Sequence, residues 1–368
     1  MSGKNLILLS AGGTGGHMTP ARALAQDLVS RGFRIELVTD VRGKKLAHLF
    51  GDIPVHVVRS GTVGAGIKGK IRGAFDLGVG FAHAFYLVLR LRPKMVIGFG
   101  GYPSVPAVYM AQKLGKPTII HEQNAIIGKA NAFLAPQAGR IALSLPNVRG
   151  LNDSEKMRSV ITGNPVRPEI AALYTQPFPN FGHETPLRIF VMGGSLGAKV
   201  FSDIVPQTLA RLSPDYRKRL QIVQQCRQDD ISLVKRTYDL AGIEADLRPF
   251  FDDVAGELAK SHLIISRSGA STVAEVTTAG RPAIFVPYPH HKDQQQKMNA
   301  DAVADVGGAW VMTEDGFTPD ALLARIETFL QNPSILFRAA EKARECGKPD
   351  AARKLGNLVT AVVSGWGE

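Results

Sequence analysis

Residues Asn5–His17 read NLILLSAGGTGGH, an apolar run that leads directly into four glycines. The run Asn5–Ala11 predicts a buried parallel strand. The segment Pro20–Gly32 predicts a helix with proline near its first turn and glycine at its end. A glycine-rich turn between a strand and a helix lets the backbone approach a ligand closely, and the free N–H groups of the helix start favour an anion.

The turn carries one titratable side chain, His17, and histidine suits proton transfer near neutral pH. A lone histidine in a loop is more often structural, so this role needs support from elsewhere. The turn could instead bind a dinucleotide, with Asp40 at the end of the next strand as the ribose ligand. The G-x-G-x-x-G spacing fails, however, because counting from Gly13 and Gly15 places Met18 at the third position. A nicotinamide site is therefore disfavoured.

The length and composition indicate a globular chain of two domains. Its 368 residues are many for one core, and 45% are hydrophobic while 21% are charged. The two cysteines, Cys226 and Cys346, form neither a metal-binding spacing nor a disulfide framework, which suits a reducing compartment. The N-terminus has no signal-peptide pattern, so we do not expect secretion.

The net charge of +12 is concentrated in the first part of the chain. Residues 1–163 hold 21 lysines and arginines but only 8 aspartates and glutamates, and the remainder is nearly neutral. This asymmetry indicates an anionic partner: nucleic acid, an anionic membrane surface or an acidic substrate. Nucleic acid ranks last, because the basic residues are not interleaved with aromatic residues in a recognisable module.

Strands and helices alternate through the first half, which predicts a parallel sheet covered on both faces. The predicted strands are Asn5–Ala11, Arg34–Thr39, Val55–Val58, Met95–Gly98, Pro117–His121 and Arg140–Leu143. The passage Ile161–Pro168 is rich in proline, glycine and asparagine and lies where the charge balance changes. It predicts a domain boundary.

The second half opens in the same way, with the strand Leu187–Met192, a glycine turn over Gly193–Gly197 and a helix from Ala198. Further strands are predicted at Gln221–Gln224, Leu263–Ser266 and Ala283–Pro287. The chain therefore predicts two similar α/β domains with a ligand in the cleft between them. We expect domains at residues 1–163 and 164–345, and a C-terminal helix at 346–368 that could pack on either domain, including back on the first.

A second helix start follows the strand Leu263–Ser266, and its small residues could form another cradle for an anion or a nucleotide. The spacing of Thr272 and Glu275 fits a capping box, and on spacing alone we favour that role for Glu275. Arg267 fits an ion pair and a ligand contact equally well. Downstream, three amides at Gln294–Gln296 could bind sugar hydroxyls, although a solvated helix start is the commoner meaning of such a run.

The stretch Ile67–Pro93 has a different character. Leu77–Leu89 contains no formal charge, but its thirteen residues are fewer than the roughly 20 needed to span a bilayer. The spacing predicts one helical face with Ile71, Phe75 and Val79, preceded by basic residues at Lys68, Lys70 and Arg72. An apolar helix with basic flanks is typical of an anionic membrane interface, and the alternative is an ordinary covering helix of the sheet.

Two absent motifs narrow the chemistry. No two aspartates have D-x-D spacing, which disfavours a transferase that holds its nucleotide through a metal at that motif. No G-x-x-x-x-G-K-[ST] sequence occurs, which excludes a P-loop kinase or ATPase.

Seven motifs together resemble the MurG family of bacterial UDP-N-acetylglucosamine:undecaprenyl-pyrophosphoryl-MurNAc-pentapeptide N-acetylglucosaminyltransferases, over nearly the whole chain. They are Gly12–His17, Phe99–Ser104, His121–Asn124, Gly163–Arg167, Gly193–Ser195, Arg267–Glu275 and Gln295–Gln296. The resemblance implies the GT-B fold, with two Rossmann-like domains, the first binding the lipid acceptor and the second the nucleotide sugar. It also implies inverting transfer of GlcNAc from UDP-GlcNAc to the 4-hydroxyl of MurNAc in lipid I, which gives lipid II.

The resemblance further implies roles for single residues, with His17 as the catalytic base and Glu275 as the ligand of the ribose hydroxyls in place of a helix cap. The implied UDP-GlcNAc ligands are Thr14, Gly15, Gly16, Asn124, Arg167, Ser195, Phe251, Ala270, Ser271, Thr272, Val273, Ala274, Glu275 and Gln295, with Gly12, Gly13, Arg267 and Gln296 as further candidates. For Phe251 the contact with the uracil is expected through the backbone.

The resemblance implies no metal and no cofactor. The expected partners are UDP-GlcNAc, lipid I, the anionic inner leaflet and other proteins of cell-wall synthesis or division, with no nucleic acid. The expected location is peripheral, at the cytoplasmic face of the bacterial cell membrane. The alternative function is a UDP-GlcNAc 2-epimerase or another glycolipid synthase of the same fold. An epimerase acts on a soluble sugar and has no need of a basic, apolar surface.

Overall fold

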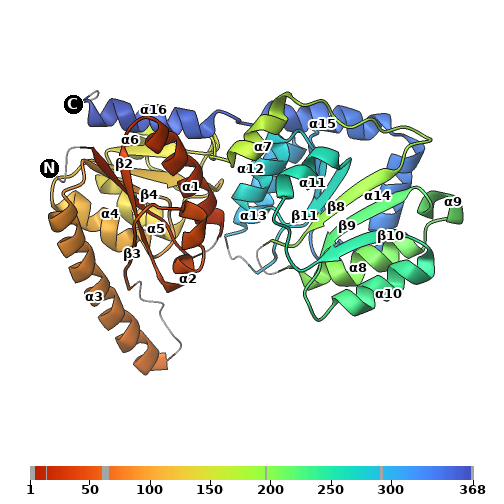
Figure 1. Ribbon diagram of the computed structural model, residues 1–368, viewed down its shortest axis with the longest axis horizontal. Helices are drawn as coiled ribbons and strands as arrows, with labels where there is room; N and C mark the ends of the chain where they lie inside the picture. The colour runs from red at the N-terminus through yellow and green to blue at the C-terminus, as the bar shows by residue number, and fades with distance from the viewer. Residues whose placement is uncertain (1–4, 14, 60–65, 195–196, 291–292, 366–368) are drawn as a thin grey trace. The chain divides into compact units, whose positions relative to one another are not determined.

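The computed structural model describes residues 5–13, 15–59, 66–194, 197–290 and 293–365, with the side chains of 66–72 and 74 also outside the description. The chain forms two compact units (Figure 1). The first contains Met1–Arg167 and Asp350–Glu368, and the second contains Pro168–Pro349. Each unit is an α/β domain with a parallel sheet, which confirms the predicted fold class.

The first unit is built on seven parallel strands in the order β3-β2-β1-β4-β5-β6-β7. Their bounds are β1 Leu6–Ser10, β2 Arg34–Thr39, β3 Val55–Val57, β4 Met95–Gly98, β5 Thr118–Glu122, β6 Arg140–Leu143 and β7 Ser159–Ile161. Six of them match predicted strands. The sequence did not predict β7, a partly exposed edge strand of three residues.

Helices cover both faces of this sheet, because side chains of successive strand residues point to opposite faces. Ile7 and Leu9 of β1 pack in one apolar core, and Leu8 packs in another. The helices are α1 Gly15–Ser30, α2 Val41–Lys44, η1 Ala47–Phe50, α3 Gly66–Leu91, α4 Ser104–Lys113, α5 Lys129–Leu134, η2 Ala135–Gln137, α6 Asp153–Met157 and α16 Ala351–Val363.

The C-terminal helix α16 belongs to the first unit and lies beside α1 (Figure 1). Its Leu355 and Val359 are fully buried in the same core as Leu24 and Leu28 of α1. This apolar contact holds the end of the chain on the unit in which the chain begins.

The second unit is built on six parallel strands in the order β10-β9-β8-β11-β12-β13. Their bounds are β8 Leu187–Met192, β9 Leu220–Gln225, β10 Glu244–Arg248, β11 Leu263–Ser266, β12 Ala283–Phe285 and β13 Ala309–Val311. The sequence predicted four of these and missed the two edge strands. The sequence of β10, EADLR, is largely polar, and β13 has only three residues, so neither gives an apolar run.

The core of the second unit lies between its sheet and helices such as α8 and α14, with Phe201, Phe329 and Leu322 fully buried. The helices of this unit are α7 Pro168–Ala171, η3 Ala172–Thr175, α8 Lys199–Ala210, α9 Pro214–Arg217, α10 Ile231–Ala241, α11 Val254–Lys260, α12 Ala270–Thr278, α13 Gln295–Ala304, α14 Pro319–Gln331 and α15 Ser334–Cys346.

The strand order reverses once in each sheet, between β1 and β4 and between β8 and β11. In open α/β sheets ligands bind at this point, outside the carboxyl ends of the strands. In the first unit Gly12–His17 follows β1 and Phe99–Gly101 follows β4. In the second unit the glycines after Met192 and the segment from Arg267 occupy the equivalent places. The sheet order thus places the predicted turns where ligand sites form.

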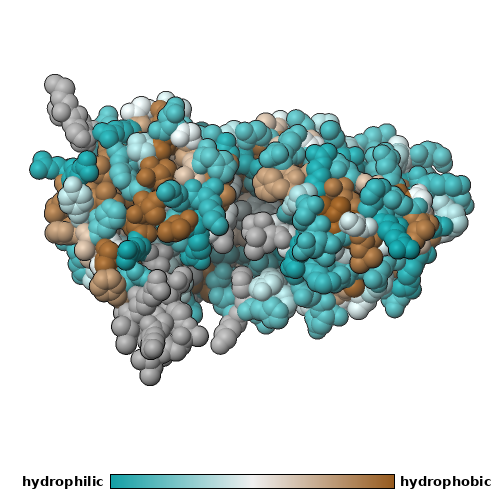
Figure 2. Space-filling view, turned by 60° about the horizontal axis from the view of Figure 1, so that its bottom comes forward, coloured by the Kyte–Doolittle hydropathy of each residue, from teal (hydrophilic) through white to brown (hydrophobic). Residues whose placement is uncertain are grey.

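Helix α3 buries one side and exposes another, as the sequence predicts. Ala84, Leu87 and Val88 are buried, whereas Phe75 is 66% exposed and Tyr86 55% exposed. Figure 2 shows apolar residues, in brown, at the surface of the first unit. Within the described part of the chain, no helix is both long and apolar enough to cross a bilayer.

Candidate functional site

His17 is the third residue of α1, and its ring is fixed by the turn that precedes the helix. Its Nδ1 lies 3.1 Å from the carbonyl oxygen of Gly12. A carbonyl oxygen only accepts hydrogen bonds, so Nδ1 carries the hydrogen and Nε2 keeps its lone pair. The geometry therefore gives His17 the tautomer of a proton acceptor.

Two glycines after β4 form a wall against this ring. Gly100 and Gly101 have φ angles of +84° and +74°, a region that favours glycine. A Cβ at Gly100 would lie 3.4 Å from Nε2 of His17, and one at Gly101 would lie 3.3 Å from Nδ1. Sequence reasoning included these glycines only within a family motif. Their approach to His17 depends on the pairing of β4 with β1.

Asp40 has a structural role instead of the ribose contact considered from the sequence. Its Oδ1 accepts hydrogen bonds from the backbone N–H of Gly13 at 3.3 Å and of Gly43 at 2.8 Å. Its Oδ2 pairs with Nε of Arg42 at 3.0 Å. Burial opposes ionisation of this carboxyl, but the hydrogen bonds from Gly43 and Arg42 outweigh it, so the pKa of Asp40 lies below its usual value. Asp40 thus holds the glycine turn in place.

The surroundings of His17 favour its uncharged form. Burial lowers the pKa of His17 below the usual histidine value, the hydrogen bond to Gly12 opposes this effect, and the charge of Arg42 adds to it. An imidazole with a low pKa is unprotonated near neutral pH and can accept a proton.

Behind this site, His121 is fully buried at the end of β5 and makes a hydrogen bond at each ring nitrogen. Its Nε2 lies 3.1 Å from the carbonyl oxygen of Gly163, and its Nδ1 lies 2.9 Å from Nε2 of Gln123. The same amide of Gln123 donates to the carbonyl of Phe99. Burial lowers the pKa of His121 to about 4, so this ring is uncharged. The network joins the ends of β4 and β5.

Asn124, predicted to bind the sugar, is held by Glu122. Glu122 Oε1 accepts hydrogen bonds from the backbone N–H of Asn124 at 2.9 Å and from its Nδ2 at 3.2 Å. Oε2 accepts from Gly128 N and from Asn131 Nδ2. Burial raises the pKa of Glu122, and these hydrogen bonds oppose the rise. The sequence analysis gave Glu122 no separate role. The available signal was the position of this carboxylate directly after the predicted strand Pro117–His121.

In the second unit, α12 begins at Ala270 with Gly269 as its N-cap, and no side chain caps it. The capping box proposed from spacing is therefore wrong: Thr272 lies inside the first turn, and Glu275 lies in the middle of the helix. The N-terminal end of a helix leaves backbone N–H groups without intrahelical partners, and the first turn of α12 offers such groups at the switch point of the sheet.

Arg267, for which the sequence left two roles open, forms an ion pair with Glu314. Its Nη1 donates to the carbonyl oxygens of Val286 and Pro287, both at 3.2 Å. Its guanidinium also lies over the ring of Tyr288. Arg267 thus fixes the loop that leads toward α13, and direct contact with a ligand stays a prediction.

The neighbouring glutamines differ in their surroundings. Oε1 of Gln296 accepts from the backbone N–H of Ser268 at 3.3 Å and of Tyr288 at 3.0 Å, so it joins two loops. Gln295 donates to Asp293 at 2.8 Å. The predicted sugar contact of Gln295 stays a prediction.

The remaining predicted residues fall into four groups. Phe251 and Val273 are buried, and the ring of Phe251 packs edge-on against Phe190. Gly12, Gly13, Gly15 and Gly16 surround the start of α1, while Arg167, Ser271 and Ala274 are partly buried. Thr14 and Ser195 lie outside the described residues, as do the side chains of Lys68, Lys70, Ile71 and Arg72.

Two family models match this chain. The glycosyltransferase family 28 N-terminal domain matches residues 7–143, and the family 28 C-terminal domain matches residues 188–355. A UDP-N-acetylglucosamine–N-acetylmuramyl-(pentapeptide) pyrophosphoryl-undecaprenol N-acetylglucosamine transferase of Rhodospirillum centenum is 50% identical, over 96% of this chain and 93% of that protein. The Paramagnetospirillum magneticum protein of the same name is 46% identical, over 98% of this chain and 97% of its own length.

Solved structures agree. The crystal structure of Acinetobacter baumannii MurG matches with a TM-score of 0.78 and 30% identity, over 97% of this chain and 99% of that one. A putative UDP-N-acetylglucosamine 2-epimerase from Listeria monocytogenes matches with a TM-score of 0.68 over 99% of this chain and 97% of that one, but at 15% identity. That second likeness shows a common fold and nothing about activity.

Proposed function

This chain belongs to glycosyltransferase family 28, and we propose that it transfers GlcNAc from UDP-GlcNAc to lipid I, the undecaprenyl-pyrophosphoryl-MurNAc-pentapeptide, to form lipid II. The observation that carries this function is the geometry of His17 at the switch point of the first sheet. The rival epimerase activity has no comparable support, because its solved examples share only the fold.

The proposed acceptor site lies on the first unit. The 4-hydroxyl of MurNAc loses a proton as its oxygen attacks C1 of GlcNAc. Nε2 of His17 accepts that proton, because Nδ1 is committed to the carbonyl of Gly12. Gly100 and Gly101 lack the Cβ atoms that would press on the imidazole, so the ring fits beside them with Nδ1 directed to Gly12. Displacement at C1 by this single attack inverts the anomeric centre.

The proposed donor site lies mainly on the second unit. The leaving group is UDP, an anion, and the backbone N–H groups at the start of α12 stabilise it as the bond to C1 breaks. Glu275 accepts from the ribose hydroxyls, and the loops held by Gln296 and Arg267 shape the site. Asn124, on the first unit, hydrogen-bonds the GlcNAc. Because these backbone N–H groups stabilise the leaving anion, we propose that transfer needs no metal and that dialysis against EDTA leaves it intact.

The proposed location is the cytoplasmic face of the cell membrane, with α3 on the lipid surface. Phe75 and Tyr86 expose apolar area on this helix, and Leu89 is 47% exposed. The first part of the chain, residues 1–163, also carries the basic excess that attracts anionic lipid. Binding to vesicles containing phosphatidylglycerol should fall when all three residues are changed to Ser. A matched control changes Leu233 and Leu240, which are exposed on α10 of the second unit, to Ser.

The test of the reaction follows labelled GlcNAc from UDP-GlcNAc into a lipid I analogue, with wild type beside His17→Ala. We expect product from wild type, and at least 100-fold less from the variant at unchanged UDP-GlcNAc affinity. Equal turnover of the two proteins would remove His17 as base while leaving the transferase. Absence of product from wild type, despite donor binding, would overturn the proposed function.

A further inference from the structure

Arg42 lies at the start of α2 and is directed toward the glycine turn by Asp40. The ion pair joins Nε of Arg42 to Oδ2 of Asp40 at 3.0 Å, while the same carboxylate binds the N–H of Gly13 through Oδ1. Asp40 is 5% exposed and is the N-cap of α2, so it is a fixed support. One carboxylate therefore sets the position of both the turn and the guanidinium.

The guanidinium rests against the turn that leads to His17. Nη2 of Arg42 would lie 3.7 Å from a Cβ on Gly13, whose φ angle of +85° already favours glycine. Among the residues that the structure describes, Asp40 is the hydrogen-bond partner found for this side chain, and it occupies only Nε. Nη2 and Cζ of this half-exposed side chain are the atoms nearest to the Cβ position of Gly13.

We propose that Arg42, held by Asp40, is a positioning residue that keeps His17 in its uncharged, proton-accepting form. This inference rests on the proposed role of His17 as base. It assigns a function to a residue pair that lies outside the seven family motifs, of which the sequence analysis considered only Asp40, as a ribose ligand.

The other polar groups around His17 do not supply this effect. Asp40 carries the opposite charge, but its oxygens are committed to Gly13, Gly43 and Arg42. His121, on β5, is uncharged because burial lowers its pKa to about 4. The loop Phe99–Ser104 after β4 contains no acidic or basic side chain. Arg42 is thus the cation whose charge opposes protonation of His17, in addition to burial.

The consequence is a wider pH range for catalysis. A base accepts a proton only while it is itself unprotonated, so the acid limb of kcat/KM follows its pKa in the free enzyme. A nearby fixed cation moves that limb to lower pH. Removing the cation should move the limb to higher pH by about 0.5 to 1 unit, which is about a threefold to tenfold loss of kcat/KM on the acid side.

The first measurement is an NMR titration of ¹³C-histidine-labelled protein without substrates, with the His17 signal assigned from His17→Gln. We expect Arg42→Ala to raise the pKa of His17 and Arg42→Lys to restore most of the difference. The matched control is Arg34→Ala. Arg34 also pairs with a buried carboxylate two residues away, Glu36, but at the opposite end of the six-residue strand β2. An unchanged His17 titration in Arg42→Ala would overturn the proposal.

The second measurement is the pH profile of kcat/KM for a lipid I analogue in the same variants. A shifted acid limb with an unchanged plateau is the expected result for Arg42→Ala. A lower plateau with an unshifted limb would overturn the proposal and make Arg42 a contact of the acceptor pyrophosphate. If His17→Ala remains active, the proposed base is wrong, but the NMR titration still decides whether Arg42 controls the charge of His17.

Discussion

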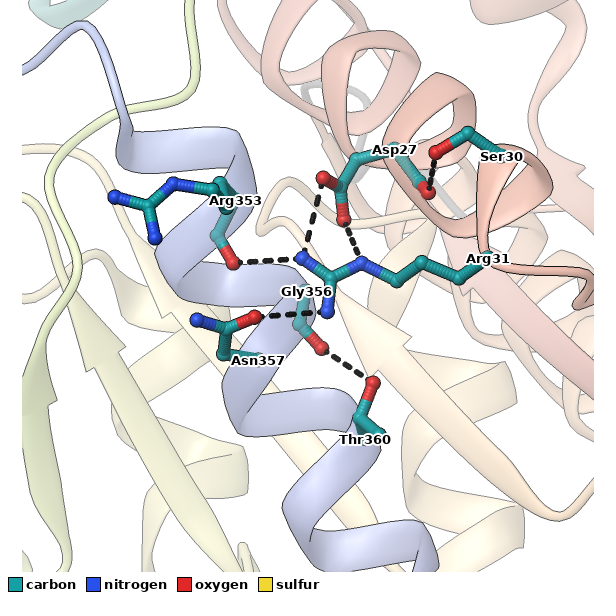
Figure 3. Close-up of polar contacts among 7 residues, drawn as sticks. All are labelled: Asp27, Ser30, Arg31, Arg353, Gly356, Asn357 and Thr360. Carbon is teal, nitrogen blue, oxygen red and sulfur yellow. Dashed lines mark hydrogen bonds and ion pairs between the residues drawn. The ribbon is translucent and has the colours of Figure 1, made fainter.

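Nη1 of Arg31 in α1 donates a hydrogen bond of 2.8 Å to Oδ1 of Asn357 in α16, across 326 residues of chain. Nη2 of the same guanidinium donates to the carbonyl of Arg353 at 3.0 Å, and Nε pairs with Asp27 at 2.6 Å (Figure 3). Gly356 lies directly beneath these groups. The hydrogen bonds of Arg31 fix the register of α16 on α1. The apolar contacts between the two helices provide most of the buried surface.

Gly356→Ala should destabilise the protein, although alanine normally stabilises a helix relative to glycine. A Cβ at Gly356 would lie 1.9 Å from Oδ2 of Asp27 and 2.9 Å from Nη2 of Arg31, so the ion pair must move. We expect a loss of about 1–3 kcal/mol in the free energy of unfolding, measured with urea. Gly78→Ala in α3 is the control, because nothing lies within 4 Å of its Cβ position. Equal effects of the two changes would contradict this account of α16.

Gly101→Ala should reduce transfer activity by more than its loss of stability explains. The new Cβ would meet the carbonyl of Gly12 at 3.1 Å and Nδ1 of His17 at 3.3 Å, and it would displace the imidazole. A misplacement of about 1 Å can cost about 100-fold in rate, so a smaller shift of the ring should lower kcat by up to about that factor. Gly115→Ala is the control, because Gly115 also has a positive φ, +66°, but open space around it. Both variants should lose about 1–2 kcal/mol from backbone strain, and only Gly101→Ala should lose activity.

Glu122→Gln should weaken donor binding. The carboxylate accepts four hydrogen bonds from N–H groups, and the amide nitrogen of glutamine cannot accept any of those that it faces. Asn124 would lose its fixed orientation, so we expect KM for UDP-GlcNAc to rise about tenfold. Glu36→Gln changes another buried carboxylate of the same unit, on β2 and bonded to Arg34 and His56, and should leave this KM unchanged. A normal KM in Glu122→Gln would show that Asn124 needs no such support.

Acid should destabilise the second unit through His262. Its Nδ1 accepts from the backbone N–H of Arg188 at 2.9 Å, and its Nε2 donates to the carbonyl of Asn180 at 3.2 Å. Burial, with the charges of Arg281 and Arg188, lowers its pKa to about 4.

In the unfolded chain His262 has the ordinary pKa of about 6.5, so the unfolded state binds the proton first as the pH falls. The stability contributed by the neutral ring is complete above pH 6.5 and is lost progressively between about pH 6.5 and 4. His262→Gln keeps one acceptor and one donor but cannot titrate. When the pH is lowered from 7.5 to 5, the free energy of unfolding measured with urea should fall by about 2 kcal/mol more in wild type than in the variant. The same pH dependence in both proteins would show that this ring does not control acid stability.

Most strands that the sequence predicted contain an apolar run, such as β1 and β8, which are largely buried. The strands that it missed, β7, β10 and β13, lie at sheet edges and are short or polar. Their strand conformation comes from pairing with a neighbour that is distant in sequence, and no local pattern records that pairing. The capping box at Glu275 failed for a related reason, since spacing alone does not say where a helix begins.

The sequence by itself determined two α/β domains, each with a glycine turn after its first strand, and the motifs that place the chain in its family. These features are local, because strand and helix periodicity and the freedom of glycine act over a few residues. Only the tertiary structure decided that Gly100 and Gly101 lie against His17, that Asp40 holds Gly13 and Arg42, and that Arg31 binds α16. Those contacts depend on the order of the strands in the sheet, because β2 and β4 lie on either side of β1. That order forms only when the whole chain folds and buries the apolar faces of its strands and helices together.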